Sequence, residues 1–165
     1  MTSLLRKVRQ ERWYEALSSR GEPLPSDPLS DLNTSRNSLS VWQVLANETN
    51  LEDIVVAITA RWDHVQNMDL VLIDEAAIRE LGIKVEASEG QTPLPHARGH
   101  HRDLVQLQAQ SLVEIAETLR SRGDFRPFSK KEVRELLARY IKEGKLNASD
   151  LQPKVRSHLE SKSLI

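Results

Sequence analysis

Three of the five histidines lie within six residues, between positions 96 and 101, and this segment holds the side chains best suited to chemistry. Neutral imidazoles bind zinc and other transition metals, and a nearby carboxylate such as Asp103 can add an oxygen ligand. Pro95 and Gly99, however, oppose the helical turn that would bring His96 and His100 onto one face. The candidate ligands for a metal or an anion in this segment are His96, Arg98, His100, His101 and Arg102.

The same segment has two further interpretations. Its histidines and arginines precede a predicted helix, whose N-terminus favours negative charge, so they would suit an anion or a phosphate. Alternatively, the segment is a surface loop with solvated side chains, and Asp103 complements the helix dipole. We expect no structural metal or cofactor here, because the chain has no cysteine and no H-E-x-x-H motif.

Asp74 and Glu75 follow a short apolar run, DLVLI, that is typical of a strand buried on both faces. Ligands of open α/β sheets gather at the carboxyl ends of strands, where two acids can hold Mg²⁺. Together with the loop at His100 and His101, they would give a metal-assisted phosphoester hydrolase. The simpler interpretation is that Asp74 caps the next helix.

Residues 120–131 interleave basic side chains with Phe125 and Phe128 in what the pattern predicts to be a turn between helices. Cationic side chains can neutralise phosphates while aromatic rings stack on bases, which suggests a nucleic-acid-binding regulator. The alternative is that both phenylalanines fold inward. The candidate phosphate contacts are Arg120, Arg122, Arg126, Lys130 and Lys131.

Other catalytic signatures are missing from the sequence. It contains no G-x-S-x-G elbow, no phosphate-binding glycine loop and no cysteine nucleophile. The pI near 6.5 also differs from that of a dedicated nucleic-acid-binding domain. We therefore have no positive sequence evidence for an enzyme.

Charge is unevenly distributed along the 165 residues, although the net charge is only −1. Residues 46–90 carry ten acids and three bases, and residues 120–145 carry nine bases and four acids. The two segments would attract each other within one fold, or each would face a different partner. The absence of a leader peptide, a long apolar run and cysteine predicts a soluble cytoplasmic protein.

At the N-terminus, residues 1–20 are predicted to form a helix with Leu4, Leu5 and Val8 on its apolar face. Residues 21–37 contain three prolines among serine, aspartate and asparagine, which is typical of a linker. We therefore expect a tethered helix that docks on the body of the protein or on a second copy.

The central residues alternate between strand and helix patterns. Residues 38–45, 69–73 and 83–87 are predicted strands, and residues 50–66 and 75–81 are predicted helices. The first two strands and their connecting helix form a β-α-β unit, expected to be parallel and right-handed. The third strand would sit at a sheet edge.

The C-terminal third is predicted to be helical. A long helix is expected over residues 102–122, and a second begins at Ser129, whose hydroxyl can form a capping box with Glu132. Gly144 supplies its left-handed end. A last helix is expected from about residue 149.

These patterns predict an α+β fold with a small three-stranded sheet around a β-α-β unit, covered by helices. Residues 38–165 would form a single domain, with C-terminal helices from residue 102. The favoured function is a non-enzymatic interaction or regulatory protein of a prokaryotic type that binds protein partners, including a second copy of itself. The hydrolase and the nucleic-acid regulator described above are the alternatives.

Overall fold

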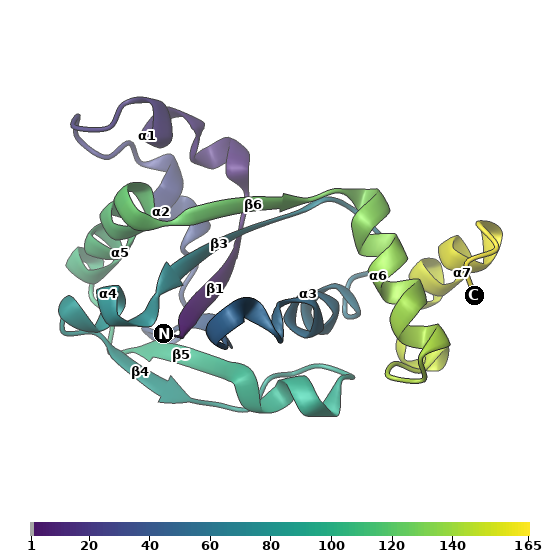
Figure 1. Ribbon diagram of the computed structural model, residues 1–165. Coiled ribbons are helices and arrows are strands. Elements are labelled where there is room, and N and C mark those ends of the chain that lie inside the picture. The colour runs from purple at the N-terminus through teal and green to yellow at the C-terminus, as the bar shows by residue number, and fades with distance from the viewer. Residues whose placement is uncertain (1) are drawn as a thin grey trace.

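The centre of the protein, a computed structural model that describes residues 2–165, is a six-stranded sheet (Figure 1). Its order is β4-β5-β2-β1-β3-β6, and every neighbouring pair is antiparallel. The strands are β1 (Ser3–Val8), β2 (Leu39–Val44), β3 (Met68–Asp74), β4 (Lys84–Ala87), β5 (His101–Val105) and β6 (Asp124–Phe128).

Helices cover both faces of this sheet, so it has a hydrophobic core on each side. The first face packs against α3 (Leu51–Thr59), α6 (Lys130–Lys142) and α7 (Pro153–Ser161). The second packs against α4 (Glu75–Glu80) and α5 (Ala109–Arg122), with the short helices α1 (Tyr14–Ser18) and α2 (Asp27–Asp31) nearby. None of the helices in residues 2–165 has the length and apolar composition needed to cross a membrane.

The predicted α+β class is confirmed, but the predicted three-stranded sheet is wrong because the sheet has six strands. The strand–helix–strand unit β2-α3-β3 is present in an altered form. Both β2 and β3 pair antiparallel with β1, so they run parallel to each other with β1 between them. The predicted third strand corresponds to β4, which does lie at an edge.

The predicted N-terminal helix is wrong, because residues 3–8 form β1 near the middle of the sheet. Leu4 and Leu5 are consecutive, so in a strand they point to opposite faces. Leu5 joins the core under α3, while Leu4 and Val8 join the core under α5. The spacing of Leu4, Leu5 and Val8 also fits the apolar face of a helix. Because charged residues follow Leu5, the sequence did not indicate a strand in the middle of a sheet.

Two further strands replace predicted helix or turn. The expected helix over residues 102–122 begins only at Ala109, because residues 101–105 form β5 between β2 and β4. Gln106, with a φ of 60°, separates strand from helix. The expected turn before Ser129 is the edge strand β6, in which Phe125 and Phe128 pack into opposite cores. Pro127 is tolerated because β6 is an edge strand.

The helix predicted from Ser129 is confirmed. The Ser129 Oγ accepts the Glu132 N–H at 3.2 Å, and the Glu132 carboxylate accepts the Ser129 N–H at 2.7 Å. Gly144 follows the helix with a φ of 69°. Local capping chemistry therefore fixed both ends of α6, independently of the tertiary contacts that decided β1 and β5.

Candidate binding groove

A hollow with a volume of about 480 Å³ lies on the α3 side of the sheet. It is an open groove between the end of α3, strands β2 and β5, and the loop after β4. We call it the tryptophan groove. Its lining residues are Ser40, Trp42, Ala57, Ile58, Arg61, Trp62, Glu89, Gln91 and His101.

Trp42 and His101 form the floor of the tryptophan groove. They are register partners on β2 and β5, and their rings meet edge to face with centroids 5.0 Å apart. The loop after β4 passes directly against Trp42. A Cβ at Gly90 would lie 2.6 Å from the Trp42 ring, so the loop can approach this closely only with glycine.

Trp62 and Arg61 line the opposite wall, and Lys7 lies against Trp62 outside the lining residues. The Lys7 Nζ lies 4.7 Å from the centre of the Trp62 ring, a cation–π contact. Arg61 donates from Nη1 to the Gln91 carbonyl at 2.9 Å. Among residues 2–165 neither Lys7 nor Arg61 forms an ion pair with a carboxylate.

His101 is a neutral imidazole at neutral pH. Burial lowers its pKa, the Asp103 carboxylate raises it and Arg102 lowers it, and the net shift is downward. Its Nδ1 lies 2.6 Å from the Ser88 Oγ. The ring is thus fixed by Ser88 and Trp42, and it offers a hydrogen-bonding, uncharged surface to the groove.

The structure disperses the other members of the predicted histidine cluster. His96 Nε2 lies 3.2 Å from Asp53 Oδ1, which also accepts the Tyr140 hydroxyl at 2.6 Å. Arg98 donates to the Thr92 carbonyl at 3.1 Å. His100 ends the short 3₁₀ turn, Pro95–His100, that precedes β5. Within the described chain no three His, Asp or Glu side chains are grouped so that they could hold a metal.

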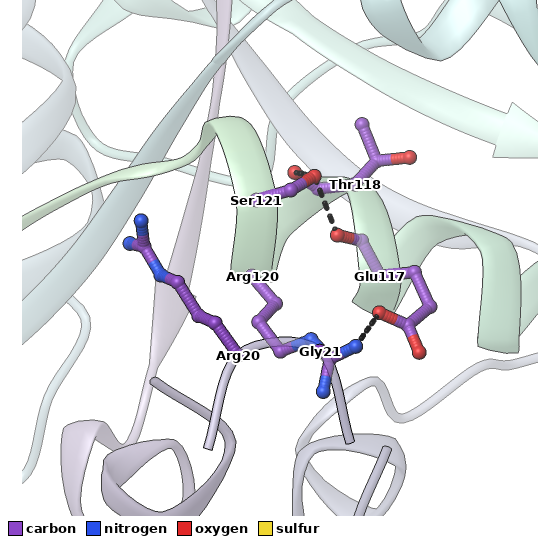
Figure 2. A pocket seen from close by; sticks show the side chains of 6 residues that line it. All are labelled: Arg20, Gly21, Glu117, Thr118, Arg120 and Ser121. Carbon is purple, nitrogen blue, oxygen red and sulfur yellow. Dashed lines mark hydrogen bonds and ion pairs between the residues drawn. The ribbon is translucent and has the colours of Figure 1, made fainter. Parts of the chain in front are cut away.

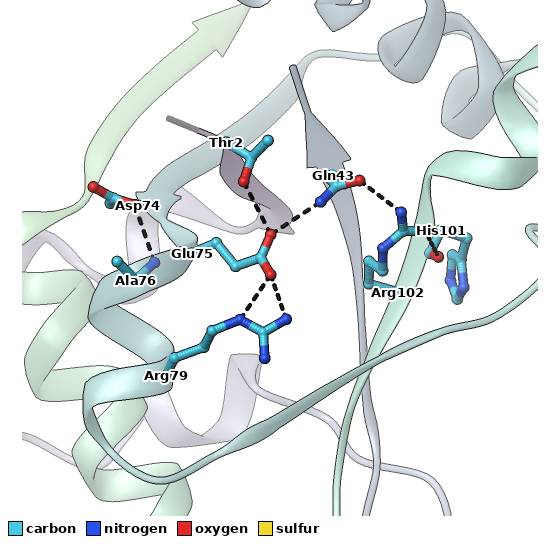
Figure 3. Close-up of polar contacts among 8 residues, drawn as sticks. All are labelled: Thr2, Gln43, Asp74, Glu75, Ala76, Arg79, His101 and Arg102. Carbon is cyan, nitrogen blue, oxygen red and sulfur yellow. Dashed lines mark hydrogen bonds and ion pairs between the residues drawn. The ribbon is translucent and has the colours of Figure 1, made fainter. Parts of the chain in front are cut away.

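Asp74 and Glu75 point into different surroundings (Figure 3). The Asp74 carboxylate accepts the Ala76 N–H at 3.0 Å, so it caps α4. Glu75 accepts hydrogen bonds from Thr2 at 3.2 Å, Gln43 at 3.0 Å and Arg79 at 2.6 and 2.9 Å.

The Glu75 network is closed. Burial raises the pKa of the Glu75 carboxyl, but the hydrogen bonds from Arg79, Gln43 and Thr2 outweigh burial and hold the pKa below its usual range. Gln43 in turn accepts from Arg102 at 2.6 Å, and Arg102 also donates to the Gly99 and His101 carbonyls. These residues connect β2, β5 and α4 rather than forming an open acidic site.

The arginines of residues 120–131 are occupied by contacts within the fold. Arg120 is buried, pairs with Glu117 and donates to the Glu22 carbonyl at 2.9 Å. It forms one wall of a shallow hollow of about 300 Å³ between α5 and the Pro-rich segment (Figure 2). Arg122 pairs with Glu80 at 2.8 Å.

Other bases in this region also meet acids. Arg126 pairs with Glu48 at 2.6 Å, and Lys131 lies 3.9 Å from Glu135. The side chain of Lys130 has no such partner in the described residues, although its N–H donates to Asn67. Pairs from the basic segment to Glu48 and Glu80 show that the two oppositely charged segments attract each other within one fold.

Sequence reasoning missed the tryptophan groove. In β2, Trp42 lies on the opposite face from Leu39 and Val41, and Trp62 packs against the same core as Trp42. The usable signal was a tryptophan, a residue that is rarely buried completely, on the strand face that it shares with Ser40. Lys7 gave no signal, because residues 3–8 were interpreted as a helix.

Comparison with protein-family models, with curated proteins and with solved structures gives no match.

Proposed function

We propose that this is a non-enzymatic interaction protein whose recognition surface is the tryptophan groove. The single observation that carries the proposal is the pair of half-buried tryptophans, Trp42 and Trp62, in the walls of one open hollow. Tryptophan and arginine are enriched among the residues that dominate the binding energy of protein interfaces. In this groove the two tryptophans occur together with Arg61.

The charges at the rim define the chemistry of the partner. Lys7 and Arg61 are cations without carboxylate partners among the described residues, whereas Glu89 lies 3.9 Å from Arg98. The two aromatic walls favour an apolar or aromatic side chain, and the two cations favour a neighbouring carboxylate. The occupant we propose is a polypeptide segment of a partner protein that carries an apolar anchor beside Asp or Glu.

The alternatives receive less support from the same geometry. A metal-assisted hydrolase needs Asp74, Glu75 and the His100-His101 loop in one site, but Asp74 caps α4 and Glu75 is enclosed by donors. A nucleic-acid regulator needs exposed bases on residues 120–131, but Arg120, Arg122 and Arg126 are paired with acids.

A displayed library of random peptides, selected on the full chain, tests the proposal. We expect selected peptides to share an apolar residue beside an acidic one. Trp62→Ala should weaken their binding roughly tenfold or more, because hot-spot tryptophans contribute about 2 kcal/mol or more. Lys7→Met should weaken it less and reduce its salt dependence.

Tyr14→Ala is the matched control, since it removes an aromatic ring that is 61% exposed on α1, outside the groove. Peptides whose binding is reduced equally by Tyr14→Ala and Trp62→Ala would contradict the proposal. So would a groove occupied by a second copy of the chain, seen as a dimer in sedimentation that Trp62→Ala dissociates.

A further inference from the structure

Two groups of basic residues in the C-terminal part differ in their partners. Arg122, Arg126 and Arg139 each pair with a glutamate of the acidic segment, respectively Glu80, Glu48 and Glu52. The second group comprises Lys130 and Arg134 on α6 and His158 and Lys162 on or next to α7. None of this second group forms an ion pair in the described residues 2–165.

Helix spacing groups these residues in pairs. Lys130 and Arg134 are four residues apart and therefore share one face of α6. His158 and Lys162 have the same spacing at the end of α7. Leu137 of α6 and Val155 and Leu159 of α7 belong to one core, so both helices pack on the same face of the sheet. We call these four residues the α6–α7 basic cluster.

The three cations lie close enough to His158 to affect its pKa. Burial lowers the pKa of His158, and Lys130, Arg134 and Lys162 lower it further, with no carboxylate acting in the opposite direction. The three positive charges of Lys130, Arg134 and Lys162 lie near a neutral imidazole without a counter-charge, which is unfavourable. An anion bound among them would remove that repulsion.

Two nitrogens of the cluster also lack hydrogen-bond partners. The Arg134 Nε and the His158 Nε2 are both inaccessible to solvent, and neither has a partner in the described residues. A buried polar group without a partner destabilises the fold, because it has lost its hydrogen bonds to water. Each of these nitrogens can donate a hydrogen bond, so an anion bound among these side chains would supply the missing acceptors.

We propose that the α6–α7 basic cluster binds a phosphate group. Phosphate offers several strong acceptor oxygens and carries up to two charges near neutral pH, so it can use two ammonium groups, a guanidinium and an imidazole together. A carboxylate has only two oxygens and one charge. The site is separate from the tryptophan groove and does not depend on what occupies it.

Titration of inorganic phosphate, followed by the NMR signals of His158 at constant ionic strength, tests the site. We expect saturable binding and a rise in the pKa of His158, because the anion offsets the surrounding cations. Lys130→Gln and Lys162→Gln, combined, should weaken binding roughly tenfold or more. Both lysines are exposed, so these changes leave the core intact even where Arg134→Gln disturbs folding.

Lys142→Gln is the matched control, because Lys142 is an exposed lysine of the same helix without an ion-pair partner in the described chain. Equal weakening by Lys142→Gln, or a His158 pKa that phosphate leaves unchanged, would overturn the proposal and indicate a diffuse charge effect.

A short DNA duplex distinguishes the two sources of phosphate. Duplex binding that phosphate displaces and the double variant weakens assigns the site to a nucleic-acid backbone. Binding of phosphate alone assigns it to small phosphate compounds, and a duplex that binds while phosphate does not would contradict the compact site.

Discussion

The Glu75 network and the tryptophan groove both contain charged side chains, but these are paired with each other in the network and lack carboxylate partners in the described residues beside the groove. Around Glu75, each donor meets an acceptor inside the chain, and the carboxylate is only 9% exposed. Around Trp62, Lys7 and Arg61 keep unused charge beside an open hollow. A closed network stabilises the fold and leaves nothing for a ligand. An open groove contributes less to folding and retains its capacity to bind.

Removing the centre of the closed network should therefore have the largest effect on stability. Glu75→Ala leaves Gln43, Thr2 and Arg79 without their shared acceptor. Loss of one partner of a fully buried pair costs about 3–5 kcal/mol, but the Arg79 side chain is half exposed and can be hydrated. We expect a loss of about 2–3 kcal/mol in denaturant unfolding at neutral pH. Glu80→Ala is the control, because Glu80 forms an exposed ion pair with Arg122. This variant should change the free energy of unfolding by less than about 1 kcal/mol.

The same carboxylate should make stability depend on acid. The pKa of Glu75 is lowered in the folded state, so its contribution is complete above the unfolded pKa of about 4.3 and is lost as the pH falls through the folded value. The stability difference between the natural protein and Glu75→Gln should narrow progressively below about pH 4. Unfolding midpoints measured from pH 7 to pH 3 test this, and a difference that stays constant over the range would show that Glu75 is not ionised in the network.

Changes in the open groove should cost less. In Gly90→Ala the new Cβ would lie 2.6 Å from the Trp42 ring, so the loop or the ring must move. Overpacking of this kind costs roughly 1–3 kcal/mol, and an open site lies at the lower end because the loop can shift into solvent. We expect about 1 kcal/mol and a change in Trp42 fluorescence. Gly99→Ala is the control, since nothing lies within 4 Å of a Cβ there.

The smallest effect is expected at Lys7. Lys7→Met retains the aliphatic stem on Trp62 but removes the cation–π contact, which is worth about 0.5–1 kcal/mol at exposed positions. A thermal shift of a few degrees or less in calorimetry is the expected result. If this variant were as destabilising as Glu75→Ala, the groove would be part of the structural network, and the distinction between closed and open sites would fail.

Local chemistry made part of the structure predictable. Ser129 with Glu132, and Asp74 before α4, encode their helix starts within four residues, and both were identified correctly. Residues 3–8 and 101–105 could not be assigned in this way. Leu4, Leu5 and Leu104 have spacings that fit helix and strand equally, and only their pairing with distant strands decides between them.

The candidate sites show the same division. The sequence itself identified the histidine segment and the basic segment as candidate sites. The opposite charges of residues 46–90 and 120–145 also indicated that ion pairs could form between these two segments. Which bases remain unpaired depends on tertiary placement, because Arg126 reaches Glu48 whereas Arg134 meets no carboxylate in the described chain. Likewise, the sequence alone does not show that Lys7 reaches Trp62, since the two residues meet only through β1 and the end of α3.

The position of β1 has a consequence for how the chain folds during synthesis. The strand nearest the N-terminus pairs with residues 42–44 and 69–74, so it leaves the ribosome well before either of its neighbours. Until β2 emerges, Leu4, Leu5 and Val8 are apolar residues on a strand with two unpaired edges, and one edge stays unpaired until β3 emerges. Such long-range closure slows folding and leaves edges open to association. Because β1 waits for both of its partner strands, it is the segment of this sheet that a chaperone has most reason to hold.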